Sequence, residues 1–167
     1  MNNKRKYYIE KIALDARKRL IEKNIIKNDD KALSESQLVQ IVSFFGGKLN
    51  FLDNEQKTYI EKTNKNKYVI HYYKGYSYLQ VIHELGHAFL NFDDMEIGRR
   101  YFFDGPGVED TEASLFARAF IMPRLNFEQV IIEHLSDGKY SIQNVAHEYD
   151  IDYLEILARG EELNIGI

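Results

Sequence analysis

Apolar residues recur with helical spacing in the first part of the chain. Ile12, Ala13, Ala16 and Leu20 follow Ile9 at distances of three, four, seven and eleven residues. This pattern covers one face of a helix and predicts an amphipathic helix over residues 4–23. A second helix is predicted from Ser34, which forms a capping-box pattern with Gln37, to the glycine pair at Gly46.

The pattern changes after the glycine pair. Three short segments, at residues 48–52, 58–62 and 67–73, are rich in β-branched and aromatic side chains and are separated by polar stretches. This composition is typical of strands. Three strands joined by short connections predict a small antiparallel meander.

Helical patterns then occupy most of the second half. Helices are predicted at about 76–91, 108–122, 126–135, 141–149 and 152–162, and a polar, Gly-rich loop at 91–108. We therefore expect an α+β fold: a mainly helical single domain over 1–167, with a small antiparallel sheet packed on the 76–91 helix. A helical C-terminal subregion is expected at about 126–167.

Composition narrows the functional classes. The chain has 167 residues, a formal net charge of −4, 44% hydrophobic residues and no cysteine. The lack of cysteine excludes disulfides and thiolate metal sites and suits a reducing cytoplasm. No apolar run is long enough to span a membrane, and no clustered basic surface points to nucleic acid. We expect a cytoplasmic protein that binds neither a membrane nor nucleic acid directly.

The most informative motif is His83-Glu84-Leu85-Gly86-His87, which has the form H-E-x-x-H. Two histidines four residues apart lie one turn apart on a helix, so both side chains can reach one metal ion. Glu84 is then placed to act on water beside that ion, which is the chemistry of a zinc hydrolase. The same five letters also arise by chance, so the rest of the chain must support the interpretation.

A catalytic zinc ion needs a third protein ligand. The best oxygen donors are Glu109 and Glu112, which share one face of the 108–122 helix, so one can bind the metal while the other orients a histidine. Acidic residues are also favoured near helix N-termini by the helix dipole, which explains Glu109 and Asp110 equally well. This explanation is weaker for Glu112, which flanks the small apolar face of the helix.

Together the two motifs resemble the ImmA/IrrE metallopeptidases. Those proteins carry H-E-L-G-H followed by E-x-E-A-N-x-F-A-x-x-L-L-M-P, and this chain has Glu112-Ala113, Phe116-Ala117 and Met122-Pro123 in the matching positions. The resemblance implies a zincin-like fold with Zn²⁺ on His83, His87 and Glu112, and Glu84 as the catalytic carboxylate. Glu109 stays the alternative or supporting ligand that its helix spacing suggests. The chain departs from the pattern at Ser114, where Asn is common, at Glu109, which lies three residues before Glu112 rather than two, and at Asn91, where His is often found.

The resemblance also implies a biological role. It predicts a zinc endopeptidase that cleaves a helix-turn-helix repressor of a phage or integrated mobile element, restrained until a signal or activator protein arrives. One alternative is a non-catalytic protein that sequesters the repressor and keeps zinc as a structural ion. A second is a DNA-binding regulator, suggested by the rhythm of residues 146–152, although residues 141–162 contain only Arg159 as a cation.

Overall fold

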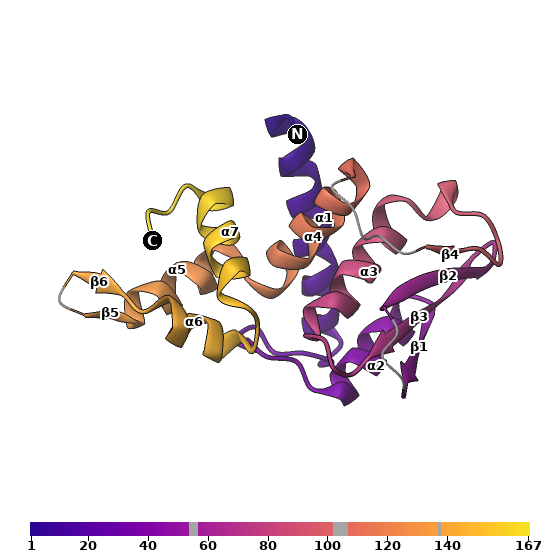
Figure 1. Cartoon of the computed structure of the whole chain (residues 1–167), viewed down its shortest axis with the longest axis horizontal. Coiled ribbons are helices and arrows are strands. Elements are labelled where there is room, and N and C mark those ends of the chain that lie inside the picture. Colours follow the sequence, from indigo (N-terminus) through magenta and orange to yellow (C-terminus); the bar gives the residue numbers. More distant parts are fainter. Residues whose placement is uncertain (54–56, 102–106, 137) are drawn as a thin grey trace.

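The computed structural model describes residues 1–53, 57–101, 107–136 and 138–167 (Figure 1). In chain order the elements are α1 (Asn3–Glu22), α2 (Glu35–Phe44), β1 (Gly47–Leu52), β2 (Tyr59–Asn64), β3 (Lys67–Tyr73), α3 (Leu79–Leu90), the short 3₁₀ helix η1 (Phe92–Asp94), β4 (Arg100–Tyr101), α4 (Val108–Ile121), α5 (Arg124–Glu133), β5 (Leu135–Ser136), β6 (Lys139–Tyr140), α6 (Ile142–Tyr149) and α7 (Tyr153–Leu163). The expected α+β class is confirmed. The loop expected at 91–108 is described only outside residues 102–106.

The helix boundaries follow local sequence signals. Ser34 accepts a hydrogen bond from the backbone N–H of Gln37, whose side chain returns to the backbone of Ser34, so the predicted capping box is confirmed at the start of α2. Gly46 directly follows the C-cap of α2 and has φ +86°, the left-handed conformation that favours glycine. Among the described helices, none combines the length and the apolar character needed to cross a membrane.

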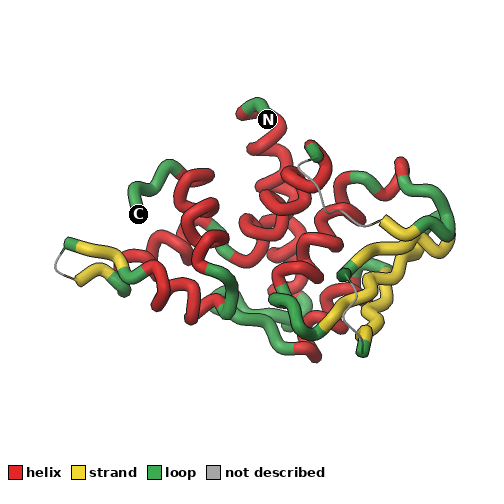
Figure 2. The backbone as a smooth tube through the Cα atoms, viewed as in Figure 1, coloured by secondary structure: helices red, strands yellow, loops and turns green. Residues whose placement is uncertain are grey.

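The four-stranded sheet has the order β1-β3-β2-β4. Its strands, drawn in yellow in Figure 2, gather at one end of the molecule. β2 pairs antiparallel with β3, but β1 pairs in parallel with β3, from Gly47 opposite Tyr68 to Leu52 opposite Tyr73. The expectation of a purely antiparallel sheet was therefore wrong. One edge of β2 pairs with β3 and the other pairs with β4, which comes from the segment expected to be a loop. β1 pairs with the opposite edge of β3.

Helices α3 and α4 form the centre of the molecule. The sheet lies on one side of α3 and the C-terminal helices lie on the opposite side of α4 (Figure 1). Gly86 makes the close approach possible: a Cβ at this position would lie 3.1 Å from both the Cα and the carbonyl oxygen of Ala113. The glycine therefore lets the backbone of α4 pass beside the H-E-x-x-H helix.

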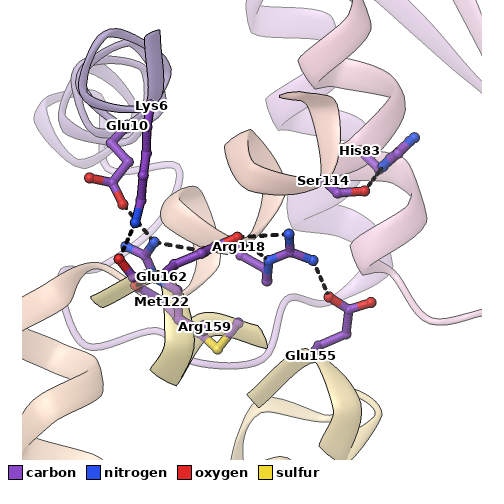
Figure 3. A network of polar contacts seen from close by, with 9 residues as sticks. All are labelled: Lys6, Glu10, His83, Ser114, Arg118, Met122, Glu155, Arg159 and Glu162. Atoms are coloured by element: carbon purple, nitrogen blue, oxygen red, sulfur yellow. Dashed lines mark hydrogen bonds and ion pairs between the residues drawn. The ribbon is translucent and has the colours of Figure 1, made fainter. Parts of the chain in front are cut away.

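Buried charged groups attach the C-terminal helix α7 to the centre. Arg159 is 2% exposed and donates to the carbonyl oxygen of Met122 at 3.0 Å and to the carboxylates of Glu10 and Glu162 at 2.8 and 3.0 Å. Figure 3 shows these side chains converging between α1, α4 and α7. Since each group has a partner of opposite charge or a carbonyl, the network fixes where α7 lies relative to α4.

Candidate metal centre

The two motif histidines face one another inside the protein. His83 and His87 lie one turn apart on α3, and they are 8% and 0% exposed. Their Nε2 atoms are 3.1 Å apart. Glu84, which follows His83 on the same helix, is also buried at 2% exposed. The motif is therefore part of the interior wall of a site and not a polar surface of a helix.

Helix α4 supplies two further groups, both aimed at His83. Asp110 Oδ1 lies 3.1 Å from His83 Nε2, and Ser114 Oγ lies 3.2 Å from His83 Nδ1 (the Ser114 contact is drawn in Figure 3). Asp110 and Ser114 are four residues apart, so they share one face of α4. Each ring nitrogen of His83 thus has its own oxygen partner.

The histidines are held in the neutral form that binds metals. Burial lowers the pKa of His87 to about 3, with the neighbouring His83 adding to the effect and Asn91 opposing it. Burial also lowers the pKa of His83, against the opposing influence of Asp110. Neutral imidazole can donate a nitrogen lone pair, whereas imidazolium cannot. At neutral pH both rings are therefore ready to act as ligands.

Residues 78–159 match the model of the Peptidase M78 family, described as the IrrE N-terminal-like domain. This segment belongs to the ImmA/IrrE metallopeptidase family. The match runs from just before α3 into α7, so it contains all the residues of the site. Comparisons with curated proteins and with solved structures gave no match. The resemblance to ImmA/IrrE proteins that the motifs indicated is confirmed.

His83, His87 and Asp110 form a group that fits a divalent metal ion, as expected of a metallopeptidase. One donor atom from each of His83, His87 and Asp110 can be chosen so that all lie within 4.8 Å of one another. Two imidazole nitrogens and one carboxylate oxygen form a ligand set that suits zinc. Ser114, on the second nitrogen of His83, can fix the orientation of that ring, as outer partners of ligating histidines do.

The structure places the two carboxylates that the sequence offered as a third ligand, Glu112 and Glu109, away from this group. Glu112 is 6% exposed, but its carboxylate holds the guanidinium of Arg5, with Arg5 Nε 2.7 Å from Glu112 Oε1. Glu109 is exposed on the surface. Two residues along a helix amount to about 200° of rotation, so Asp110 and Glu112 project to different sides of α4. The structure therefore brings Asp110, and neither Glu109 nor Glu112, to the histidines.

A sequence signal for Asp110 was present. The E-x-E-A pattern has an acidic residue two positions before the second Glu, and in this chain that position is Asp110. Asp110 is also four residues before Ser114, the residue at the position where Asn is common. The shared helix face of these two residues was the signal that could have found both partners of His83.

Three further polar side chains, Tyr72, Tyr101 and His134, make contacts with residues outside the group of His83, His87 and Asp110. The Tyr72 hydroxyl donates to the carbonyl oxygen of Tyr76 at 2.6 Å, and the Tyr101 hydroxyl accepts from the backbone N–H of Glu96 at 2.6 Å. His134 Nε2 lies 2.5 Å from a carboxylate oxygen of Glu148. These contacts hold loops and helices together.

Proposed function

We propose that the protein is a zinc-dependent endopeptidase. The observation that carries the proposal is the convergence of His83, His87 and Asp110 on one point, beside Glu84 on the same buried helix. Two histidines, one carboxylate and a separate carboxylate base make up the set of groups that metal-dependent peptide hydrolysis requires. Membership of the ImmA/IrrE metallopeptidase family supports this assignment.

The three ligands and the base have separate tasks. His83, His87 and Asp110 would hold the metal ion, which when bound supplies Lewis acidity and lowers the pKa of water to near neutrality. Glu84 accepts a proton from the attacking water and returns a proton to the leaving amine. Because Glu84 is buried, its charge acts in a medium of low dielectric constant, where it is more effective than in water.

We further propose that the substrate is a helix-turn-helix repressor of a phage or integrated mobile element, and that its cleavage derepresses the genes of that element. The support for this step is the resemblance of the two motifs to ImmA/IrrE proteins. A narrow substrate range and control by an activator protein would follow from the same resemblance.

The test uses the full chain loaded with zinc and a purified helix-turn-helix repressor encoded next to it. Mass spectrometry of the products is expected to show two fragments from one cleaved bond. Glu84→Gln should retain zinc and bind the repressor without cutting it. If Glu84→Gln relieves repression in cells as well as the wild type does, the protein acts by sequestration and the peptidase proposal is wrong.

A further inference from the structure

A small pocket of about 180 Å³ opens directly onto the metal centre. Its lining includes His83, Asp110 and Ser114, together with Gln80 of α3 and Glu155 of α7. Pockets that take a whole drug-sized ligand have volumes of about 300–1,000 Å³, so this one has room for a single side chain. A side chain held here would belong to a residue next to the bond positioned at the metal centre.

Glu155 is held in place at this pocket by Arg118. Arg118 Nη1 lies 2.8 Å from Glu155 Oε2, and the same guanidinium pairs with Glu162 at 2.7 Å. Figure 3 shows one oxygen of Glu155 facing Arg118 and the other turned away from it. A carboxylate has about four lone-pair positions, so Glu155 can accept further hydrogen bonds while it stays bound to Arg118.

In the part of the chain that the structure describes, the pocket is lined by acidic and not by basic side chains, and the guanidinium of Arg118 contacts Glu155 from outside this lining. Its described lining contains two carboxylates, Asp110 and Glu155, and neither lysine nor arginine. Asp110 belongs to the ligand set, which leaves Glu155 for the substrate. Glu155 also lies in the first turn of α7, where the helix dipole stabilises a negative charge.

We infer that Glu155 selects substrates with a lysine or arginine side chain next to the scissile bond. This inference rests on the proposed function, because the pocket is defined by its position beside the metal centre. The cation of the substrate pairs with the second oxygen of Glu155, and the side-chain carbonyl of Gln80 offers another acceptor. A pairing of this kind between a substrate cation and a part-buried carboxylate changes affinity on the order of ten-fold.

The test measures binding and cleavage separately. Zinc-loaded Glu84→Gln protein is immobilised and exposed to a mixture of blocked hexapeptides, and the retained peptides are identified by mass spectrometry. Lysine and arginine peptides are expected to be enriched about ten-fold over neutral ones. Adding Glu155→Gln should remove the enrichment, and adding Glu155→Lys should replace it with enrichment of acidic peptides. Glu161→Gln, an exposed change of the same charge on the same helix, should leave it intact.

The two proposals can fail independently. The peptide mixture is also incubated with zinc-loaded protein that retains Glu84. Cleavage without a basic preference, a preference that survives Glu155→Gln, or no retained peptide would overturn the role of Glu155. Retention of basic peptides through Glu155 without any cleavage would sustain that role and count against the peptidase. Circular dichroism of each variant checks that α7 is still folded.

Discussion

Arg5 and Glu112 form a two-pronged ion pair between α1 and α4, in which Nε lies 2.7 Å from Oε1 and Nη2 lies 2.5 Å from Oε2. Both oxygens of the buried Glu112 are therefore engaged by one guanidinium. Asp110, two residues earlier on α4, turns to the opposite side and contacts His83. The pair thus separates two neighbouring carboxylates, one bound to Arg5 and one facing His83.

This separation predicts which carboxylate binds zinc. Asp110→Asn should weaken zinc binding by more than roughly 100-fold, since loss of an outer partner of a ligand alone costs 10–100-fold. Glu112→Gln should leave zinc affinity within a few-fold of the wild type. Competition of each protein with a chromogenic chelator measures both affinities. If Glu112→Gln loses much zinc affinity and Asp110→Asn loses little, the third ligand is Glu112, as expected from the sequence, and not Asp110.

Glu112→Gln should instead lower stability. The change leaves Arg5 without its ionic partner, but the Arg5 side chain is 37% exposed and can be solvated by water, so the loss is about 1–2 kcal/mol. For a chain of this size such a loss lowers the melting temperature by about 2–8 °C. Thermal denaturation of the zinc-free protein checks this, and an unchanged melting temperature would show that the ion pair contributes nothing.

Ser114 is expected to raise the affinity for zinc by fixing the orientation of the His83 ring. Ser114→Ala removes the oxygen 3.2 Å from His83 Nδ1, so the ring loses the partner that fixes its orientation. Zinc affinity should fall about 10–100-fold with little effect on folding. Ser114→Asn, which restores a polar group at the position where Asn is common in related proteins, should recover most of the affinity. Equal affinities in Ser114→Ala and the wild type would exclude this role.

The sequence predicted the local structure well because the signals are themselves local. The capping pair of Ser34 and Gln37, the helical apolar repeats and the H-E-x-x-H spacing each depend on residues within one or two turns. The parallel pairing of β1 with β3 joins two strands that are separated in the chain by β2, so no local pattern records it. β4 has only two residues, too few to give an alternating pattern, so its pairing with β2 was not predictable.

The same limit applies to the candidate site: residues on one helix were predictable from the sequence, and contacts between helices were not. His83, Glu84 and His87 follow from one helix and were placed together as expected. The choice between Asp110 and Glu112 depends on how α4 is rotated against α3, which is fixed by packing at Gly86 and by Arg5, more than 100 residues away in the chain. Glu155 reaches the pocket only because α7 packs back on α4, which no local pattern records.

The close contact at Gly86 gives a fourth prediction. Gly86→Ala gains about 1 kcal/mol of helix propensity, but its Cβ would lie 3.1 Å from the backbone of Ala113, and crowding of this kind costs about 1–3 kcal/mol. We expect a net loss of about 1 kcal/mol in the free energy of unfolding, and weaker zinc binding because α4 carries Asp110. Gly166→Ala, where nothing lies within 4 Å of the added Cβ, is the control. A more stable Gly86→Ala protein would show that α4 can move aside.

The histidines also make the stability of the metal-free protein depend on pH. Burial lowers the pKa of His87 to about 3 in the folded protein, whereas an unfolded histidine has a pKa of about 6.5. Below pH 6.5 the unfolded chain therefore binds a proton that the folded protein does not accept. Stability attributable to His87 is constant above that pH and decreases as the pH falls toward 3.

His87 alone should thus remove about 1 kcal/mol from the free energy of unfolding between pH 6.5 and 5.5. Urea denaturation at the two pH values, with a chelator present to keep the protein free of metal, measures the change. His87→Gln lacks the titrating ring, so its stability should decrease less over the same interval, with the difference between the two proteins reporting His87. Equal decreases in both proteins would mean that His87 takes up its proton as readily when folded as when unfolded, and the buried, neutral ligand inferred from the structure would then be wrong.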